Sequence, residues 1–177
     1  MKYLSILSIA IFLFASCTEE QKVQSTAANL TPAKQEVTLD PQVFNQKLDQ
    51  GISISEARKL KAGDEVLISG KIIGAHSVFV ENRASFIIGD HNILTSCDLH
   101  EGDNCQAPWD VCCEESKDIA ANTLSIQLVD DSGMILKTGL KGKNGLKELS
   151  LVTIKGSVSP QSSEAAMIIN ATAIQLD

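Results

Sequence analysis

The chain has 177 residues with a formal net charge of −7, and 44% of them are hydrophobic. This length and composition are enough for one domain with a buried core. The acidic balance argues against nucleic acid as a partner, because affinity for nucleic acid comes largely from Lys and Arg on phosphates. The sequence also shows no Ser-His-Asp set, no phosphate-binding glycine loop and no paired carboxylates on adjacent predicted strands. We therefore predict that the protein is not an enzyme.

The first residues have the composition of an export signal. Lys2 precedes an uncharged, mostly apolar run of 13 residues, residues 4–16. This run is shorter than the roughly 20 residues that a helix needs to span a bilayer. It is typical of the core of a signal peptide, which is removed after export.

The run ends in the sequence LFASC, residues 13–17, which resembles the lipobox of bacterial lipoproteins. In that family the cysteine, here Cys17, is acylated and becomes the new N-terminus. Phe14 departs from the pattern, which usually has Leu at this place. The resemblance implies a signal peptide over residues 1–16, a lipid anchor at Cys17, and a place in the cell envelope, on the outer membrane facing the periplasm or the surface. The alternative is an ordinary secretory signal in which Cys17 has no role.

A tether and one domain are predicted after the signal. Residues 17–40 are polar, contain Pro32 and have no sustained apolar period, which is typical of a flexible tether. Residues 41–177 remain for the domain. Its charge is concentrated in residues 90–118, where eight acidic residues face Lys117 alone, a net charge of −7. The rest of the exported chain is close to neutral.

Two short helices are predicted at the start of the domain. Asp40 is placed as a helix N-cap and is followed by proline at the first helical position, with Gly51 placed to end the helix. In the second helix, Ser53 and Glu56 have the spacing of a capping box, and Gly63 ends it. We expect both helices to plug or brace a barrel.

From residue 64 the hydrophobic pattern has a period of two, which predicts half-buried strands. The pattern over residues 66–73 returns over residues 152–158, with a glycine at the same place, Gly70 and Gly156. This shared glycine predicts a bend where a strand coils round a barrel. Further strands are predicted over residues 84–88, 124–129, 134–138 and 167–176, with a short helical turn over residues 145–149.

The predicted order is a set of strands, then a small helix, then two closing strands. This is the order of the OB-fold, a five-stranded Greek-key barrel. The V-x-I-x-G-x-[IV] segments that begin at Val66 and Val152 resemble the first and fourth strands of that fold, and the resemblance covers residues 64–176. We therefore predict a mainly β domain, a small OB-like barrel with short N-terminal helices and a cysteine-rich insertion. A sandwich of the same strands is the alternative.

The insertion, residues 90–122, shows neither a strand period nor a helix period. It contains four cysteines, and residues 108–114 have the sequence PWDVCCE. This segment resembles a signature of uncharacterised OB-like lipoproteins of Gram-negative bacteria. The resemblance implies the same fold and compartment. It implies no reaction, because that family has no established activity.

The even number of cysteines in the insertion predicts two disulfides in an oxidising compartment. A bond between the neighbours Cys112 and Cys113 would strain the peptide between them, so each is expected to pair with Cys97 or Cys105. The pairing itself stays open. Loops this short would contribute roughly 2–3 kcal/mol each. No cofactor is predicted on this interpretation.

The alternative for the same residues is a metal site. Cys97, His100, Cys105 and either Cys112 or Cys113 could furnish four thiolate or imidazole ligands for tetrahedral zinc. Soft sulfur ligands would also suit copper(I). The spacings match no paired Cys-x-x-Cys motif, and the lack of that motif also weakens a third interpretation, a redox-active thiol pair. A hard cation held by Asp98, Glu101 and Asp103 is a further alternative, although their spacing does not follow a known calcium loop.

Trp109 is the only tryptophan of the chain. We predict that it packs against a disulfide or caps the end of the barrel. The functional alternative is a surface platform on which a sugar or a base stacks, which makes Trp109 a candidate ligand contact. A group of lysines is predicted to be a solvated face, with contact to phosphate or anionic lipid as the alternative. These are Lys137, Lys141, Lys143 and Lys147.

The function expected from these features is that of a non-catalytic binding or adaptor module. It would be held at the membrane by its lipid, with protein or glycan as the partner. The first alternative is metal binding or thiol redox work by the segment from Cys97 to Cys113. The second is binding of single-stranded nucleic acid, which only the analogy with other OB-folds suggests.

Overall fold

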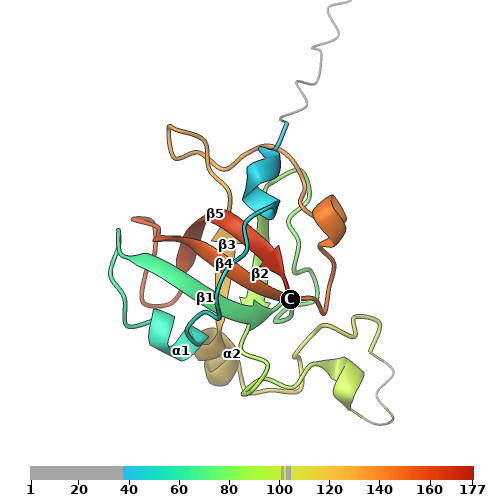
Figure 1. Cartoon of the computed structure of the whole chain (residues 1–177). Coiled ribbons are helices and arrows are strands. Elements are labelled where there is room, and N and C mark those ends of the chain that lie inside the picture. The colour runs from blue at the N-terminus through green and yellow to red at the C-terminus, as the bar shows by residue number, and fades with distance from the viewer. Residues whose placement is uncertain (1–37, 101, 103–104) are drawn as a thin grey trace, which may run out of the picture. The chain divides into compact units, whose positions relative to one another are not determined.

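The computed structural model describes residues 38–100, 102 and 105–177 (Figure 1). The predicted signal peptide, the predicted lipidation site Cys17 and all but the last three residues of the predicted tether lie outside the described residues. Within the described part of the chain, no helix is long and apolar enough to cross a bilayer.

Five strands form a closed barrel in the order β1-β2-β3-β5-β4 (Figure 1). Neighbouring strands are antiparallel except β3 and β5, which are parallel. A closed five-stranded barrel is the architecture of the OB-fold. The predicted OB-like fold is therefore confirmed, and the sandwich alternative is wrong. The strands are β1 (Glu65–Lys71), β2 (Ser85–Gly89), β3 (Thr123–Gln127), β4 (Leu151–Val158) and β5 (Ile168–Leu176).

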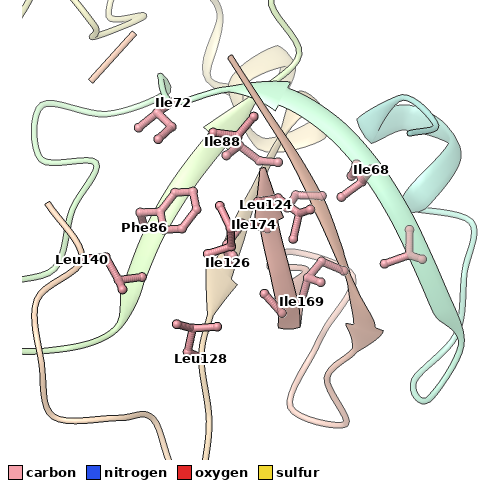
Figure 2. Packing of buried hydrophobic residues seen from close by; sticks show 14 of the residues in the cluster. Ile68, Ile72, Phe86, Ile88, Leu124, Ile126, Leu128, Leu140, Ile169 and Ile174 are labelled. Atoms are coloured by element: carbon pink, nitrogen blue, oxygen red, sulfur yellow. The ribbon is translucent and has the colours of Figure 1, made fainter. Parts of the chain in front are cut away.

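The interior of the barrel is filled by aliphatic side chains and one phenylalanine. Burial alternates along β1, as the period of two predicted. Figure 2 shows Ile68 of β1, Phe86 of β2 and Ile126 of β3 pointing into the same space, and all three are fully buried. Each such side chain contributes about 1.5–3 kcal/mol relative to an exposed one. The barrel is thus a packed core and not a channel.

Gly156 lies where β4 bends, as predicted. The register between β4 and β5 shifts between Lys155 and Gly156. A Cβ atom at residue 156 would lie 2.3 Å from the carbonyl oxygen of Asn170. Only glycine lets the two backbones approach this closely.

Both N-terminal helices are present but short. The first, η1 (Pro41–Phe44), is one turn of 3-10 helix, and the predicted N-cap Asp40 precedes it. The second, α1 (Ile54–Ala57), carries the predicted capping box between Ser53 and Glu56. Segments η1 and α1 lie against β5 and β1 respectively, so the expectation that they brace the barrel is confirmed.

A third helix, α2 (Ser116–Asn122), lies beside α1 at one end of the barrel (Figure 1). The guanidinium of Arg58, which follows α1, donates to the carbonyl oxygen of Thr123 at 2.6 Å and to that of Ala120. Helix α2 falls inside the insertion, where no helix was predicted. Its seven residues are too few for an apolar period to show in the sequence.

Two predicted elements are wrong. Residues 134–138 form no strand; an isolated bridge joins Val129 to Ile135. The carboxylate of Asp130 accepts hydrogen bonds from backbone N–H groups in the turn. These local bonds compete with the hydrogen bonds that would pair the segment with a neighbouring strand. The helical turn expected over residues 145–149 is replaced by η3 (Lys143–Gly145). A further 3-10 turn, η2 (Cys97–Leu99), lies in the insertion.

Candidate metal centre

Backbone hydrogen bonds inside the insertion bring distant cysteines together. The N–H of Cys97 donates to the carbonyl of Asp110 at 2.9 Å, and the N–H of Asp98 donates to the carbonyl of Pro108 at 2.8 Å. These two bonds hold the first half of the insertion against the second. They place Cys97 close to Cys112, which follows it by 15 residues.

The insertion is fixed to the barrel by a small hydrophobic cluster of its own. One of its members, Ile73, lies two residues after the end of β1, so the cluster joins the insertion to the wall of the barrel. The cluster gives the loop a rigid base on which side chains can be positioned. Its buried members are Ile73, Leu94 and Val111, and the half-buried side chains around them are Trp109, Ile119 and Leu149.

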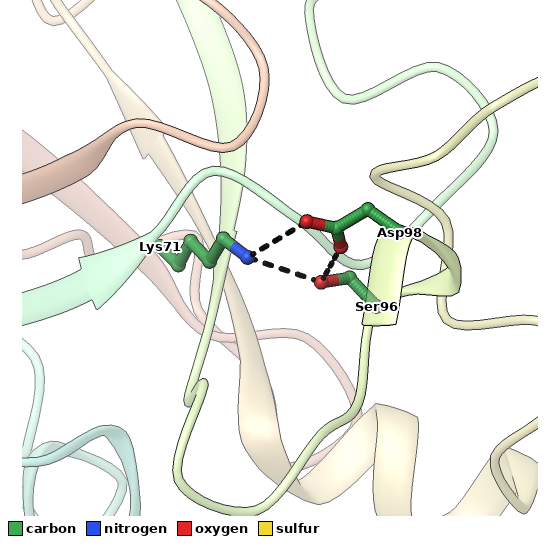
Figure 3. A network of polar contacts seen from close by, with 3 residues as sticks. All are labelled: Lys71, Ser96 and Asp98. Carbon is green, nitrogen blue, oxygen red and sulfur yellow. Dashed lines mark hydrogen bonds and ion pairs between the residues drawn. The ribbon is translucent and has the colours of Figure 1, made fainter. Parts of the chain in front are cut away.

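A polar network pins the segment just before and after Cys97 to the end of β1 (Figure 3). The ammonium group of Lys71 donates to the hydroxyl of Ser96 at 3.1 Å and lies 3.7 Å from a carboxylate oxygen of Asp98. The hydroxyl of Ser96 in turn donates to the same carboxylate at 2.5 Å. Ser96 is buried. Lys71, Ser96 and Asp98 are thus bonded to one another. Because Ser96 and Asp98 flank Cys97, these bonds fix the position of Cys97.

Three cysteine sulfur atoms converge above this base. The Sγ atoms of Cys97, Cys105 and Cys112 all lie within 4.8 Å of one another, and those of Cys97 and Cys112 are 3.6 Å apart. A disulfide requires about 2.05 Å. Among the described residues no two sulfur atoms lie at that distance. The structure therefore brings together three of the four predicted cysteines as a cluster of thiols.

The environment of the cluster favours protonated thiols when no cation is bound. Burial, followed by the neighbouring thiols of Cys112 and Cys105, raises the pKa of Cys97 well above its usual range. For Cys112, a hydrogen bond with Cys97 lowers the pKa, but desolvation and the thiols around it outweigh this and raise the pKa overall. Three thiolates at this spacing need a positive charge between them.

The other predicted ligands are arranged differently. His100 is exposed, and its ring is not part of the group of converging ligand atoms. Cys113 is also exposed and lies outside that group, although its thiol interacts with Cys112. Asp98 is engaged with Lys71 and Ser96, and Glu101 and Asp103, which complete the alternative hard-cation site, lie outside the described residues.

Trp109 packs across both hydrophobic clusters, as its predicted capping role requires. Its indole N–H donates to the carbonyl of His76 at 2.9 Å. The ammonium group of Lys141 lies 5.7 Å from the centre of the indole ring and pairs with Glu148 at 2.5 Å. Because Lys141 lies over the ring, a stacking ligand would have to displace it. All four lysines of this group are exposed, and Lys141 also contacts Trp109 and Glu148.

The residues that orient the cluster could not be identified from sequence patterns. Lys71 occupies an ordinary position in an alternating strand, and Ser96 has no motif around it. Their role depends on the contact between β1 and the insertion, which only the folded chain creates. The cysteines themselves were identifiable by their number and by the predicted compartment.

Comparison with known protein families finds no family model that matches this chain, and a search of curated proteins finds no match either.

Proposed function

We propose that the protein is a lipid-anchored domain outside the cytoplasm that binds a thiophilic metal ion and has no catalytic role of its own. The observation that supports metal binding is the convergence of the sulfur atoms of Cys97, Cys105 and Cys112 within 4.8 Å. Soft thiolate ligands select ions such as Cu(I) and Zn²⁺. The lipid anchor at Cys17 rests on the sequence alone.

The charge around the cluster suits a cation. Residues 90–118, which contain the three cysteines, carry a net charge of −7 in the sequence. An acidic environment raises the local concentration of cations. A bound ion would also replace the three thiol protons and so remove the repulsion that thiolates at this spacing would suffer.

Two disulfides remain the competing prediction. The sulfur atoms of Cys97 and Cys112 are close enough for a small movement to join them. A second disulfide would then have to join Cys105 to Cys113, whereas the sulfur atoms that converge within 4.8 Å are those of Cys97, Cys105 and Cys112. Because this group of three sulfurs suits a metal ion, we favour the metal site.

The test uses the full-length protein isolated from cell envelopes in detergent without added reductant. Intact mass before and after reduction reports the acyl group and any disulfide, and elemental analysis reports the metal. The reduced protein is then titrated with Zn²⁺ and with Cu(I) under anaerobic conditions. We expect one ion per chain.

Single substitutions identify the ligands. Cys97→Ser, Cys105→Ser and Cys112→Ser should each lower the metal affinity by more than the roughly 10–100-fold that loss of a ligand's hydrogen-bond partner costs, since each removes a ligand. His100→Ala is the matched control, because this potential ligand of the same loop lies outside the cluster, and it should leave the affinity unchanged. A protein that arrives with two disulfides and binds no metal after reduction would contradict the proposal.

The partner of the domain stays a prediction, with protein or glycan favoured over nucleic acid. A groove of about 790 Å³ lies beside Trp109 and is the candidate contact surface. It is lined by the β1–β2 connection, residues 76–82, and by the β3–β4 connection near Lys141. Binding of single-stranded DNA that weakens with salt would revive the nucleic-acid alternative.

A further inference from the structure

We propose that the ion is Cu(I) and that Cys113 is the ligand through which it enters and leaves the cluster. This inference rests on the metal site proposed above and adds the identity of the ion and the route by which it exchanges. It assigns a separate role to each of the two adjacent cysteines, Cys112 and Cys113.

The number of ligands favours Cu(I). The group of converging ligand atoms consists of three sulfurs, from Cys97, Cys105 and Cys112; among the described residues, no imidazole or carboxylate completes it. Structural zinc sites are almost always four-coordinate and tetrahedral. Cu(I) is softer, prefers thiolates and accepts three of them in a plane, so three sulfurs alone satisfy it.

The cluster is buried at one end and open at the other. Cys97 is only 5% exposed, Cys105 is half-buried, and Cys112 is exposed. An ion from outside cannot reach the sulfur of Cys97 first. It must meet the exposed side of the cluster before it can bind to the buried sulfur.

The adjacent thiols of Cys112 and Cys113 are both exposed. Cys112 belongs to the cluster of three sulfurs, and Cys113 is the next residue of the chain. Cys112 is therefore shared between that cluster and an outer pair of thiols. The outer pair, Cys112 and Cys113, presents two sulfurs to a donor, which is enough to hold Cu(I) transiently.

The transfer is a sequence of ligand exchanges in which copper stays in the +1 state. The thiols of Cys113 and Cys112 each lose a proton to solvent as a Cu–S bond forms, and the donor ligand leaves. The thiols of Cys105 and Cys97 then lose their protons and bind the ion. The Cu–S bond to Cys113 breaks, and that sulfur regains a proton. Release follows the same steps in reverse.

The experiment compares the full-length reduced protein with three variants under anaerobic conditions. Cu(I) is supplied as its bicinchoninate complex and withdrawn with bathocuproine disulfonate, which gives the affinity and the rates of uptake and release. Cys113→Ser should keep the wild-type affinity and slow both rates about tenfold, because a tethered thiol acts at a roughly millimolar effective concentration. Cys97→Ser and Cys112→Ser should lose affinity.

The results that would contradict the exchange route, the identity of the ion and the proposed function can be told apart. If Cys113→Ser lowers the affinity as much as Cys97→Ser does, Cys113 is a permanent ligand and the exchange route is wrong. If Cys113→Ser changes neither affinity nor rate, the route is also wrong. Stronger binding of Zn²⁺ than of Cu(I) in direct competition would overturn the identity of the ion alone. Absence of binding by the wild-type protein to either ion would instead remove the proposed function itself.

Discussion

Lys71 holds the segment that carries Cys97. Its side chain is only 14% exposed, and it bonds to Ser96 and Asp98 on either side of the cysteine. Removal of the Lys71 ammonium group would leave the buried hydroxyl of Ser96 and the carboxylate of Asp98 with fewer hydrogen-bond partners. The cluster geometry therefore depends on a residue that is not a ligand.

Lys71→Met tests this dependence. We expect the free energy of unfolding to fall by about 1–3 kcal/mol, the cost of leaving such groups unsatisfied. Metal affinity should fall as well, because η2 loses its attachment to β1. Chemical denaturation and metal titration measure the two effects. Lys155→Met is the control, since this exposed strand lysine has no ion pair with described residues, and it should change stability by less than about 0.5 kcal/mol.

For single residues, the sequence predicted which residue types take part in the site better than it predicted which of them lie together. The number of cysteines and the predicted export signal indicated that residues 97–113 are a site of sulfur chemistry. They could not say that Cys105 joins Cys97 and Cys112 while Cys113 and His100 lie outside the group. That selection depends on backbone hydrogen bonds between two halves of an irregular loop, which have no periodic signature.

Among the elements, α1 depends on its cap. The side chain of Ser53 accepts from the N–H of Glu56, and Glu56 accepts from the N–H of Ser53 at 3.0 Å. Hydrogen bonds from the backbone and side chain of Ser53 lower the pKa of Glu56. A folded-state pKa below the unfolded one means that this stabilisation is present above the unfolded value of about 4.3 and is lost as pH falls through the folded value.

Ser53→Ala should therefore destabilise the protein at neutral pH, by about 1 kcal/mol for the lost cap. The difference from wild type should shrink as the solution is acidified through the pKa of Glu56. Denaturation curves at several pH values, with the Glu56 titration followed by NMR, measure both quantities. A difference that is constant from neutral to acid pH would show that the hydrogen bond from the Ser53 hydroxyl to Glu56 adds nothing to the cap.

The bend in β4 gives a second prediction for an element. Gly156→Ala should cost about 1–3 kcal/mol, the range for overpacking, because the new Cβ would collide with the carbonyl of Asn170. Gly139→Ala is the control, as the nearest atom to its new Cβ would be 3.9 Å away, on Asn82. Thermal unfolding of both variants checks the contrast. Equal melting temperatures would mean that the bulge can relax.

Elements with a strong local pattern were predicted well. Strands β1 and β4 share an alternating pattern with a glycine, and the caps of η1 and α1 have specific residues at specific spacings. Residues 134–138 also alternate, yet they form only a bridge, because Asp130 bonds the turn internally. Helix α2 was not predicted, because it is short and its contacts with Arg58 and α1 depend on the folded chain.

For the whole molecule, the metal and the fold should be thermodynamically linked. A ligand that binds only the folded state stabilises it, by about 2.7 kcal/mol when its free concentration is about a hundred times Kd. The melting temperature of the reduced protein should thus rise with Cu(I) concentration. Cys97→Ser should abolish the rise. A melting temperature that Cu(I) leaves unchanged would mean that the ion binds folded and unfolded chains alike.

The strand order has a consequence for how the chain is made. Strand β1 bonds to β4, and β3 bonds in parallel to β5, so each of these pairings joins segments far apart in the sequence. A nascent chain cannot complete its barrel until residues 168–176 have been synthesised and have emerged, and such long-range pairing forms slowly. The export predicted from the sequence would require the polypeptide to thread through a membrane before it folds. Late closure would suit such passage, because the barrel can form only after its last strand has arrived.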